Sequence, residues 1–271
     1  MQSQVSVIIP CYRCSETIER AVESVISQTL PPKEILLVED CSDDEGATLA
    51  SLYRLKQNFQ DKISIRIISL KENSGPGGAR NAGWDEAQQP YLAFLDADDS
   101  WHPRKLEIQY QWMKSHPEVT LTAHQSVWIM PGEPPPAFPE RLNVRPVRIY
   151  PLLVSNLFPT RSVMLLRKIA YRFEPAKRYA EDYLLWLRIV LGGKSAWLLE
   201  APLAYSYKAD FGAQGLTGNL WKLEKGEIDT YRKIHQDRLI SRVLYSGLVL
   251  FSLLKFLRRL LISYFQRCQT R

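Results

Sequence analysis

Three carboxylates close a short apolar run in the first half of the sequence. The run is Tyr91 to Leu95, and Asp96, Asp98 and Asp99 follow it. It is too short for a stable helix and too apolar for an exposed edge, so it predicts a central strand buried on both faces. Open α/β sheets bind ligands at the carboxyl ends of their strands. An Asp-x-Asp pair there offers the oxygen ligands that Mg²⁺ and Mn²⁺ prefer, and a polar turn that caps the next helix is the alternative.

Two further acidic pairs stand at the boundaries of apolar patterns. Glu39 and Asp40 end a second apolar run and begin a polar turn. Glu181 and Asp182 fall in the first turn of a strong helix pattern over residues 179–191, where the helix dipole stabilises anions. A solvated turn accounts for the first pair, and a dipole-stabilised helix start accounts for the second. Taken singly, neither pair requires a functional role.

Strand and helix patterns alternate through the first third of the chain. The expected strands lie at residues 5–10, 34–39, 63–70 and 91–95. The expected helices follow Ser15, span residues 45–58, and run from the Gly-rich stretch 73–83 to about residue 88. Such alternation predicts a mostly parallel sheet with right-handed crossovers, and it brings the polar loops to one edge of that sheet.

The second half of the chain has weaker patterns. A helix is expected from Pro103 to about Ser115. Further strands are expected at residues 119–127, 162–166, 197–199 and 205–207, and a helix at residues 179–191. Residues 131–146 contain six prolines, which predicts an irregular loop. This loop is a candidate for the side of the molecule that binds an acceptor, with an ordinary surface linker as the alternative.

Composition and charge restrict the class of protein. With 271 residues and 45% hydrophobic content, the chain can bury a full core, so we expect one catalytic domain with an appendage. The net charge of +6 suits nucleic acid, anionic lipid or phosphorylated ligands. The C-terminal segment is basic and contains no acid after Asp237. This distribution favours a membrane surface and argues against a nucleic-acid partner.

The C-terminal segment predicts an amphipathic helix. An apolar run from Val243 to Leu254 is interrupted by Lys255 and then by Arg258 and Arg259. A membrane-spanning helix needs about 20 predominantly apolar residues, which this segment does not supply. An interfacial helix whose basic side chains face anionic head groups fits the pattern better. A helix that packs on the domain or on a second subunit is the alternative.

The start of the chain and its cysteines indicate the compartment. No charged segment followed by a long apolar stretch opens the sequence, so we predict no signal peptide and a cytoplasmic protein, peripheral at the inner face of the cell membrane. Four cysteines fit a reducing compartment. Cys11 and Cys14 have C-x-x-C spacing, but no second pair follows. We therefore assign them no metal or redox role.

In their order along the chain, these motifs resemble those of the inverting glycosyltransferases of family 2. The motifs are the strand that leads to Pro10 and Tyr12, Val38-Glu-Asp-Cys-Ser42, Ala79-Arg-Asn-Ala-Gly83, Phe94-Leu-Asp-Ala-Asp-Asp99, and Ala180-Glu-Asp-Tyr183 with Trp186-Leu-Arg188. The resemblance covers roughly residues 5–235. It implies the α/β GT-A fold, a Rossmann-like, mostly parallel twisted sheet flanked by helices.

We accordingly expect two units in the chain. The first is a GT-A domain at residues 1–237, with a nucleotide-binding half at 1–115 and an acceptor-side half at 116–237. The second, at residues 238–271, is the C-terminal amphipathic helical tail.

The resemblance implies contacts to the nucleotide base. Pro10 and Tyr12 match positions that lie against the nucleotide, and the first acid after the second strand matches the one that binds the base. That acid is Glu39 here, where the family usually has Asp, so Asp40 is an alternative contact. A carboxylate that accepts a hydrogen bond from a ring N–H suits uracil or thymine, and a UDP-linked donor is therefore expected.

The resemblance also implies contacts to the ribose and diphosphate. The Gly-rich loop passes the nucleotide, with Gly75 and Arg80 as contacts, although helix packing is the alternative for Arg80. Asp96 matches the acid that approaches the ribose. Asp98 matches the acid that ligates Mn²⁺ or Mg²⁺ between the diphosphate oxygens. Lys208 is expected near the diphosphate, and the sequence lacks the His that the family often has in that region, so a third metal ligand stays open.

Of the late acidic pair, the resemblance implies that Asp182 is the general base for the acceptor hydroxyl. The sequence therefore predicts a metal-dependent, inverting transfer of a sugar from a nucleoside-diphosphate donor to a glycan or lipid-linked acceptor in cell-surface polysaccharide biosynthesis. One alternative is a non-catalytic sugar-nucleotide-binding or membrane scaffold protein, and the retention of Asp96, Asp98 and Asp182 argues against it. The other is a nucleotidyltransferase, whose Gly-rich phosphate loop would replace Cys11-Tyr-Arg-Cys14 after the first strand. The sugar, the acceptor and the oligomeric state stay open.

Overall fold

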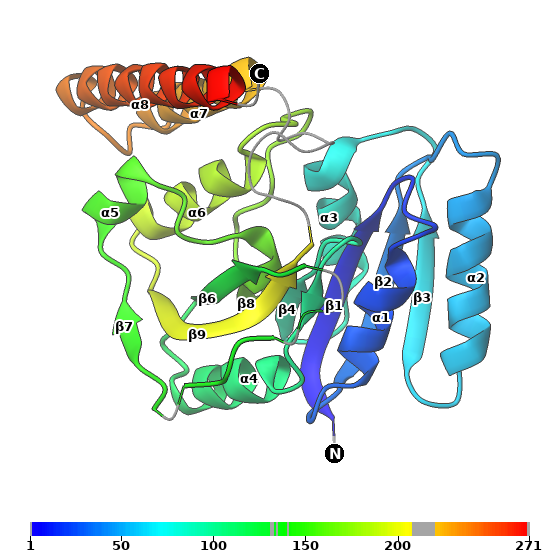
Figure 1. Ribbon diagram of the computed structural model, residues 1–271. Coiled ribbons are helices and arrows are strands. Elements are labelled where there is room, and N and C mark those ends of the chain that lie inside the picture. The colour runs from blue at the N-terminus through cyan, green and yellow to red at the C-terminus, as the bar shows by residue number, and fades with distance from the viewer. Residues whose placement is uncertain (1, 131–132, 134, 140, 208–219, 270–271) are drawn as a thin grey trace.

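One large sheet organises the protein. A computed structural model describes residues 2–130, 133, 135–139, 141–207 and 220–269, with side chains up to residue 259. Its strands are β1 Ser3–Cys11, β2 Pro32–Glu39, β3 Ser64–Ser69, β4 Tyr91–Phe94, β5 Ser100–Trp101, β6 Leu121–Trp128, β7 Val144–Pro146, β8 Met164–Leu166 and β9 Ala196–Ser206. They form a sheet in the order β3-β2-β1-β4-β8-β6-β9-β5, and β7 pairs with β9 (Figure 1).

Helices cover both faces of this sheet (Figure 1). They are α1 Ile18–Ile26, α2 Ala47–Phe59, α3 Gly75–Glu86, α4 Lys105–Ser115, α5 Ile149–Val154, α6 Glu181–Leu191, α7 Leu220–Gln236 and α8 Arg242–Gln269, with the 3₁₀ turn η1 at Thr160–Ser162. On β1, Ile8 packs in one apolar core with α3 and α6. Its neighbour Val7 packs in a second core with α1, α2 and α4. This alternation is the period of two that a strand buried on both faces must show.

The parallel sheet predicted for the first third of the chain is confirmed. Strand β1 pairs in parallel with both β2 and β4, and β2 pairs in parallel with β3. The second half differs, because β8 runs antiparallel to β4 and β6, and β9 runs antiparallel to β5 and β7. The chain enters β8 from a long connection rather than from a crossover helix, so the parallel direction is not imposed there. The sheet as a whole is therefore mixed.

Strand β9 is continuous where two short strands were expected. Pro202 lies within it, opposite Gln125, and the register with β6 shifts on both sides of that position. A proline has no N–H to donate to the ladder, and an irregular register removes the need for one. Pro202, which was expected to separate two strands, thus lies at an irregularity within one strand.

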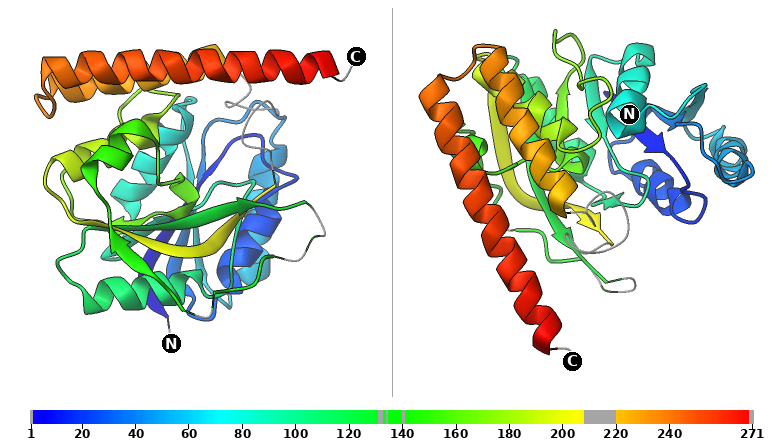
Figure 2. Two further views of the ribbon diagram at one scale, coloured as in Figure 1. Left: turned by 60° about the vertical axis from the view of Figure 1, so that its left-hand side comes forward. Right: turned by 90° about the horizontal axis from the view of Figure 1, so that it is seen from above.

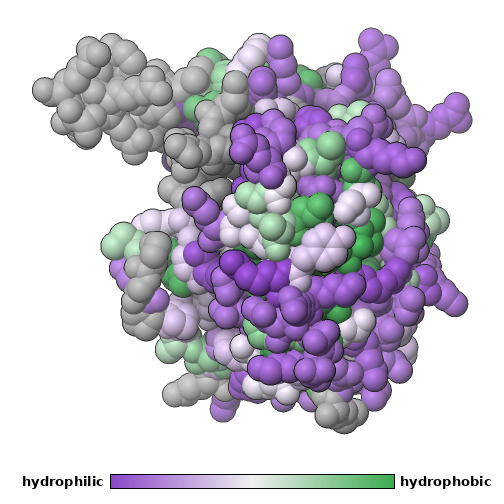
Figure 3. Space-filling view, turned by 90° about the vertical axis from the view of Figure 1, so that its right-hand side faces the viewer, coloured by the Kyte–Doolittle hydropathy of each residue, from purple (hydrophilic) through white to green (hydrophobic). Residues whose placement is uncertain are grey.

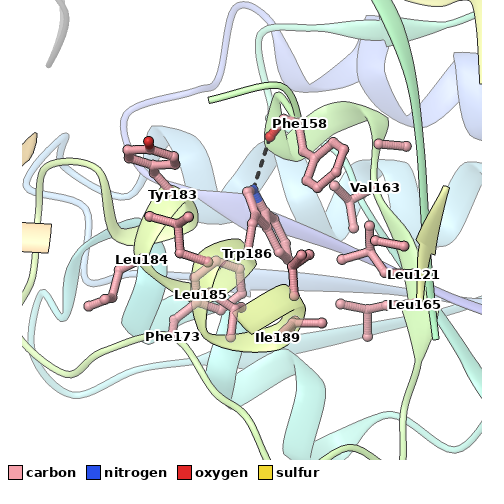
Figure 4. Packing of buried hydrophobic residues seen from close by; sticks show 14 of the residues in the cluster. Leu121, Phe158, Val163, Leu165, Phe173, Tyr183, Leu184, Leu185, Trp186 and Ile189 are labelled. Carbon is pink, nitrogen blue, oxygen red and sulfur yellow. Dashed lines mark hydrogen bonds between the residues drawn. The ribbon is translucent and has the colours of Figure 1, made fainter. Parts of the chain in front are cut away.

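Helix α6 is anchored by a large aromatic core. Trp186 is fully buried, and its indole N–H donates to the carbonyl oxygen of Phe158 at 3.0 Å (Figure 4). Its ring packs edge-on against Phe173, with 5.9 Å between the ring centroids. A buried indole needs such a partner for its N–H. The packing fixes the start of α6, which carries Glu181 and Asp182.

Helices α7 and α8 lie side by side along one side of the domain (Figure 2). Ser252 of α8 donates to Glu224 of α7 at 2.7 Å in a buried contact, and the rings of Trp221 and Phe256 lie 5.5 Å apart. The tail predicted from residue 238 is thus helical from Arg242 and packs on α7 with one face. Among the described residues, no helix is long and apolar enough to cross a bilayer.

The edge of the sheet formed by β3 is mainly hydrophilic. The side of the molecule that carries β3 and α2 shows hydrophilic side chains around smaller hydrophobic areas (Figure 3). Ile67 and Ile68 of the edge strand β3 are only partly buried. Polar surroundings of this kind restrain an edge strand from pairing with other chains.

Gly83 on α3 permits the helix to approach the sheet closely, and we expect Gly83→Ala to destabilise the protein. A Cβ at this position would lie 2.6 Å from Cγ2 of Ile8 and 3.0 Å from Cγ2 of Val38. Overpacking of this kind typically lowers the free energy of unfolding by about 1–3 kcal/mol. Urea denaturation measures it. Gly247→Ala on α8 is the matched control, because nothing lies within 4 Å of that site, and equal stability of the two variants would contradict the packing.

Candidate active site

The carboxyl ends of β1, β2 and β4 meet at one edge of the sheet, because these strands are parallel neighbours. A cavity of about 480 Å³ lies there, and we call it the sheet-edge pocket. The predicted site residues that line it are Pro10, Tyr12, Asp40, Gly75, Asp96 and Asp98. The structure therefore brings together residues from four separate loops, as the strand-end argument predicted. Lys208, which was also predicted, lies outside the described residues.

Of the acids that follow β2, Asp40 and not Glu39 lines the sheet-edge pocket. The Glu39 carboxylate is buried and accepts a hydrogen bond from the backbone N–H of Ser42 at 2.6 Å. The Asp40 carboxylate accepts from the backbone N–H of Ser74 at 2.7 Å. Burial raises the pKa of Asp40 above its ordinary value. Asp40, the alternative contact of the sequence analysis, is thus the acid that a ligand in this pocket would meet.

Arg80 links the acids of the two halves of the domain. It is almost fully buried, and its guanidinium lies 2.5 Å from Asp96 Oδ1 and 3.0 Å from Glu181 Oε1. A buried guanidinium requires such carboxylate partners. Burial, with Asp182 beside it, raises the pKa of Glu181 to about 7. Arg80 was expected to contact a nucleotide or to pack α3, and here it holds Asp96 in place and lines the neighbouring pocket.

This neighbouring cavity, the α6 pocket, measures about 460 Å³ and contains Asp182. It shares Asp96 and Arg178 with the sheet-edge pocket, so the two cavities adjoin at these side chains. Its other walls come from the loop before η1, from α7 and from α8. A ligand in each pocket would therefore meet the other near Asp96.

The Asp182 carboxylate is held in a fixed orientation. Its Oδ2 accepts hydrogen bonds from Asn156 at 3.1 Å and from the Thr160 hydroxyl at 3.0 Å. Its Oδ1 accepts from the backbone N–H of Tyr183 at 2.7 Å, which satisfies a free donor of the first helical turn. Ala180, just before the helix, has φ 54°, a left-handed conformation that is strained for alanine. Strain at this point is consistent with a functional position.

Arg178 is a site residue that the sequence analysis missed. Its side chain lines both pockets, and Nη2 donates to Asn73 Oδ1 at 2.7 Å and to the Asn73 carbonyl at 3.1 Å. A Cβ on Gly75 would lie 3.4 Å from its Cγ. The arginine therefore reaches from the second half of the domain across the Gly-rich loop of the first. Its only sequence signal was a basic residue shortly before the Glu181-Asp182 pair.

The acids after β4 have different surroundings. Asp98 lines the sheet-edge pocket with Asp96, and its backbone carbonyl accepts from Arg20 at 2.7 Å. Asp99 is buried, accepts from Arg161 at 3.3 Å, and has its pKa raised to about 7 by burial. Only the first two acids of the motif therefore face a ligand.

The Asp96 and Asp98 carboxylates fit a divalent cation that also binds a phosphate ligand. Mg²⁺ sites commonly use one or two carboxylates together with substrate phosphates and water, and this pair lines a cavity large enough for such a ligand. The part of the chain that the structure describes contains no group of three or more His, Cys, Asp or Glu side chains able to hold an ion by itself. The donor set therefore suits an ion that arrives with its phosphate ligand.

Two basic residues of α8 lie in the wall of the α6 pocket. Lys255 donates to Glu227 at 2.5 Å and to the carbonyl oxygen of Val154 at 2.9 Å. Arg259 lies 3.8 Å from the other carboxylate oxygen of Glu227. The sequence predicted that these side chains face lipid head groups. They face the domain instead, because α8 packs with this side against α7, and Arg258 stays exposed.

Comparison with known proteins places the chain among glycosyltransferases. The profile described as "Glycosyl transferase family 2" matches residues 6–178. The chain is 31% identical over 238 residues to the "Putative teichuronic acid biosynthesis glycosyltransferase TuaG" of Bacillus subtilis (strain 168), with 86% of this chain and 88% of that protein covered.

Two solved structures share the fold. The crystal structure of S. aureus TarS 1-349 in complex with UDP-GlcNAc has a TM-score of 0.68 at 19% identity and covers 92% of this chain and 70% of that one. The mannosyltransferase PcManGT from Pyrobaculum calidifontis, in complex with GDP-Man and Mn²⁺, has a TM-score of 0.64 at 17% identity, with 87% and 65% covered.

Proposed function

The chain belongs to glycosyltransferase family 2, and on this basis we propose that it transfers a sugar, with inversion, from a UDP-linked donor to a hydroxyl of a glycan or lipid-linked acceptor in cell-surface polysaccharide biosynthesis. One observation carries the proposal. The sheet-edge pocket and the α6 pocket adjoin at Asp96 and Arg178, and each contains the acid that its role requires. Asp98 lies on the first side and Asp182 on the second.

The sheet-edge pocket suits the nucleotide. Asp40 offers a carboxylate to a ring N–H, and the half-exposed ring of Tyr12 offers a surface for the base. Asp96 and Asp98 would hold Mn²⁺ or Mg²⁺, which neutralises charge on the departing diphosphate when it is bound. Arg178 adds a fixed positive charge at the junction of the two pockets, where the leaving phosphate would lie.

The α6 pocket suits the acceptor. Inversion requires the acceptor oxygen to attack the anomeric carbon from the face opposite to the diphosphate, so a base must stand across the site from Asp98. Asp182 lies in the adjoining cavity, and its hydrogen bonds to Asn156 and Thr160 orient the carboxylate. It would accept the hydroxyl proton as the glycosidic bond forms.

A screen of UDP, dTDP and GDP sugars tests the donor assignment. The expected result is a rise in Tm with UDP-sugars that depends on Mn²⁺ or Mg²⁺, because a ligand that binds only the folded state stabilises it by mass action. Preferential stabilisation by a GDP-sugar would show that the donor carries guanine in place of uracil. No stabilisation by any nucleoside diphosphate, with or without metal, would overturn the proposed function.

We further propose that α8 places the enzyme on a membrane surface. Its solvent-facing side carries Leu250, Leu254 and Leu257, which are 61%, 57% and 54% exposed and follow helical spacing. Residues 238–271 are basic and contain no acid, so an anionic bilayer would attract this segment. The exposed apolar row next to Arg258 therefore fits an interfacial helix.

Replacing the apolar row tests this role. We expect Leu250→Gln combined with Leu254→Gln and Leu257→Gln to weaken sedimentation with phosphatidylglycerol vesicles at least roughly tenfold, because each buried Leu contributes about 1.5–3 kcal/mol. Tyr53→Gln on α2, at an exposed apolar site, is the control. Nucleotide binding should stay intact in both. A full-length protein that never binds vesicles, or a variant that binds as well as the control, would refute the membrane role.

A further inference from the structure

Helix α1 presents polar side chains to the segment that carries Asp98. Arg20, Ser24 and Gln28 are spaced four residues apart, and Gln28 continues this spacing just beyond the end of the helix. Residues at this spacing lie on one side of a helix. The apolar side chains of α1 pack in the second core, and they are Ile18, Ala21, Val22 and Val25. The polar side of α1 therefore makes contacts other than core packing.

Two of these side chains hold the backbone that follows the acids. The Ser24 hydroxyl oxygen accepts a hydrogen bond from the Trp101 N–H at 3.1 Å. The Gln28 side-chain amide donates to the carbonyl oxygen of His102 at 2.9 Å. Because these bonds reach backbone atoms, they fix the path of the chain independently of the side chains that it carries. Trp101 of β5 and His102 after it are thus held against α1.

Arg20 binds the same segment at Asp98 itself. Its Nη2 donates to the Asp98 carbonyl oxygen at 2.7 Å. The guanidinium carbon lies 3.7 Å from the centroid of the Tyr207 ring, a cation–π contact that orients the planar group. The Tyr207 hydroxyl is 2.8 Å from the Ser100 hydroxyl, within hydrogen-bond distance. The turn from Asp98 to Ser100 is therefore held at one end by Arg20 and at the other by Tyr207, and these two side chains contact each other.

Stability alone does not account for an arginine at this position. The Nε of Arg20 is buried, and among the residues that the structure describes it has no hydrogen-bond partner. A buried donor without a partner lowers the stability of the fold. An apolar side chain would avoid this loss, but it would also give up the hydrogen bond to Asp98. What Arg20 supplies in exchange is its contact with Asp98, which lines the sheet-edge pocket.

We propose that Arg20 is a positioning residue that sets the orientation of the Asp98 carboxylate for a divalent cation. The inference rests on the proposed function, because it takes Asp98 as a ligand of the ion. A side chain leaves its backbone in a fixed direction, so a hydrogen bond to the Asp98 carbonyl restricts where the carboxylate can lie. Mg²⁺ requires near-ideal octahedral geometry with ligands at about 2.0–2.1 Å, which a displaced carboxylate no longer provides. Arg20 lines neither pocket, so it would act on the ion only through Asp98.

Calorimetry with UDP on the full chain, with and without Mn²⁺, tests the inference. We expect Arg20→Met to reduce the gain in UDP affinity that Mn²⁺ causes by roughly tenfold, the fold change that corresponds to one lost charge-assisted hydrogen bond. UDP affinity without metal should stay at the wild-type value, because Arg20 does not line the sheet-edge pocket. Arg20→Lys should recover only part of the metal response, since an ammonium group keeps the charge but lacks the planar face that contacts Tyr207.

Ser24→Ala is the matched control, because it removes a hydrogen bond to the same segment three residues beyond Asp98. It should lower the urea midpoint of unfolding but keep the wild-type response to Mn²⁺. Substitutions of Tyr207 provide a second test. Tyr207→Leu removes the ring that contacts Arg20 and should reduce the Mn²⁺ response, whereas Tyr207→Phe keeps the ring and should reduce it less.

A folded Arg20→Met protein that responds to Mn²⁺ as the wild type does would overturn the inference. If Arg20→Met does not fold, a wild-type response of Tyr207→Leu would overturn it equally. So would a Ser24→Ala protein that loses the response as fully as the Arg20 variants, because the effect would then follow stability. A wild-type protein whose UDP affinity does not change with Mn²⁺ or Mg²⁺ would remove the ion from Asp98 and, with it, the role of Arg20. Failure to bind any nucleoside diphosphate would instead count against the proposed function.

Discussion

Asp182→Asn should lower the rate of sugar transfer by roughly 10² to 10⁴ while leaving nucleotide affinity nearly unchanged, the range expected for loss of a positioned general base. The substitution keeps the size of the side chain and one oxygen that can accept from the Tyr183 N–H. The Thr160 hydroxyl, which now donates to Asp182, can accept from the new amide. The substitution therefore removes the basicity together with one hydrogen bond, because the Asn156 amide that now donates to Asp182 at 3.1 Å loses its acceptor. Transfer is measured with a saturating donor, and nucleotide affinity by calorimetry.

Glu181→Gln is the comparison that identifies the base. Adjacent residues on a helix point about 100° apart, so Glu181 and Asp182 cannot serve the same trajectory. Glu181 forms a buried ion pair with Arg80, so Glu181→Gln should lower the free energy of unfolding. Its transfer rate should fall less than that of Asp182→Asn. Near-normal transfer by Asp182→Asn would exclude it as the base. A folded Glu181→Gln protein without transfer would assign the role to Glu181.

Asp98→Ala should abolish the effect of Mn²⁺ or Mg²⁺ on donor binding and lower transfer by at least roughly 10², because a bound ion contributes several kcal/mol of charge stabilisation at the leaving group. The fold should persist, since Asp98 lines the sheet-edge pocket and does not belong to either apolar core. Calorimetry with nucleoside diphosphate, with and without metal, measures the effect.

Asp61→Ala is the control for Asp98→Ala, because Asp61 is an exposed acid between α2 and β3, away from the pockets. It should keep the metal dependence of the wild-type protein. An Asp98→Ala protein whose affinity still rises with Mn²⁺ would remove Asp98 from the metal site and leave Asp96 as the candidate ligand.

The same two variants separate the proposed enzyme from the other functions considered. A non-catalytic sugar-nucleotide-binding protein would bind donor but would show no transfer for Asp182→Asn to reduce. A nucleotidyltransferase would need a phosphate-binding Gly-rich loop after β1. The residues there include Cys11 and Cys14, which are buried and belong to the second apolar core. Membership of glycosyltransferase family 2 argues against that reaction.

The fold class and the position of the site were accessible from the sequence because both depend on local patterns. Apolar runs of strand length alternate with helical spacing, and parallel strands must end at one edge. Acids placed just after β2 and β4, such as Asp40 and Asp96, were therefore expected to lie close together. The α/β GT-A fold is confirmed by the likeness to TarS, and membership of the family by the matching profile.

Tertiary structure decided the features that depend on contacts between distant residues. The Arg80–Glu181 pair joins positions 101 residues apart, and no spacing rule predicts it. The loop after β2 decides that Asp40, and not Glu39, lines the pocket. Arg178 contacts Asn73 of the Gly-rich loop across a separation of 105 residues, which local sequence patterns do not reveal.

In the C-terminal helix, too, some features follow from the sequence and others from tertiary packing. Its amphipathic pattern was visible in the sequence, because helical periodicity needs only the order of residues. The sequence did not show which face of the helix contacts the domain, because Lys255 and Arg258 are both basic. Burial of Phe256 against α7 rotates Lys255 into the α6 pocket and leaves Arg258 outside. Sequence thus determined the elements and the acids at their ends, whereas packing over long sequence separations decided which charges face the ligand.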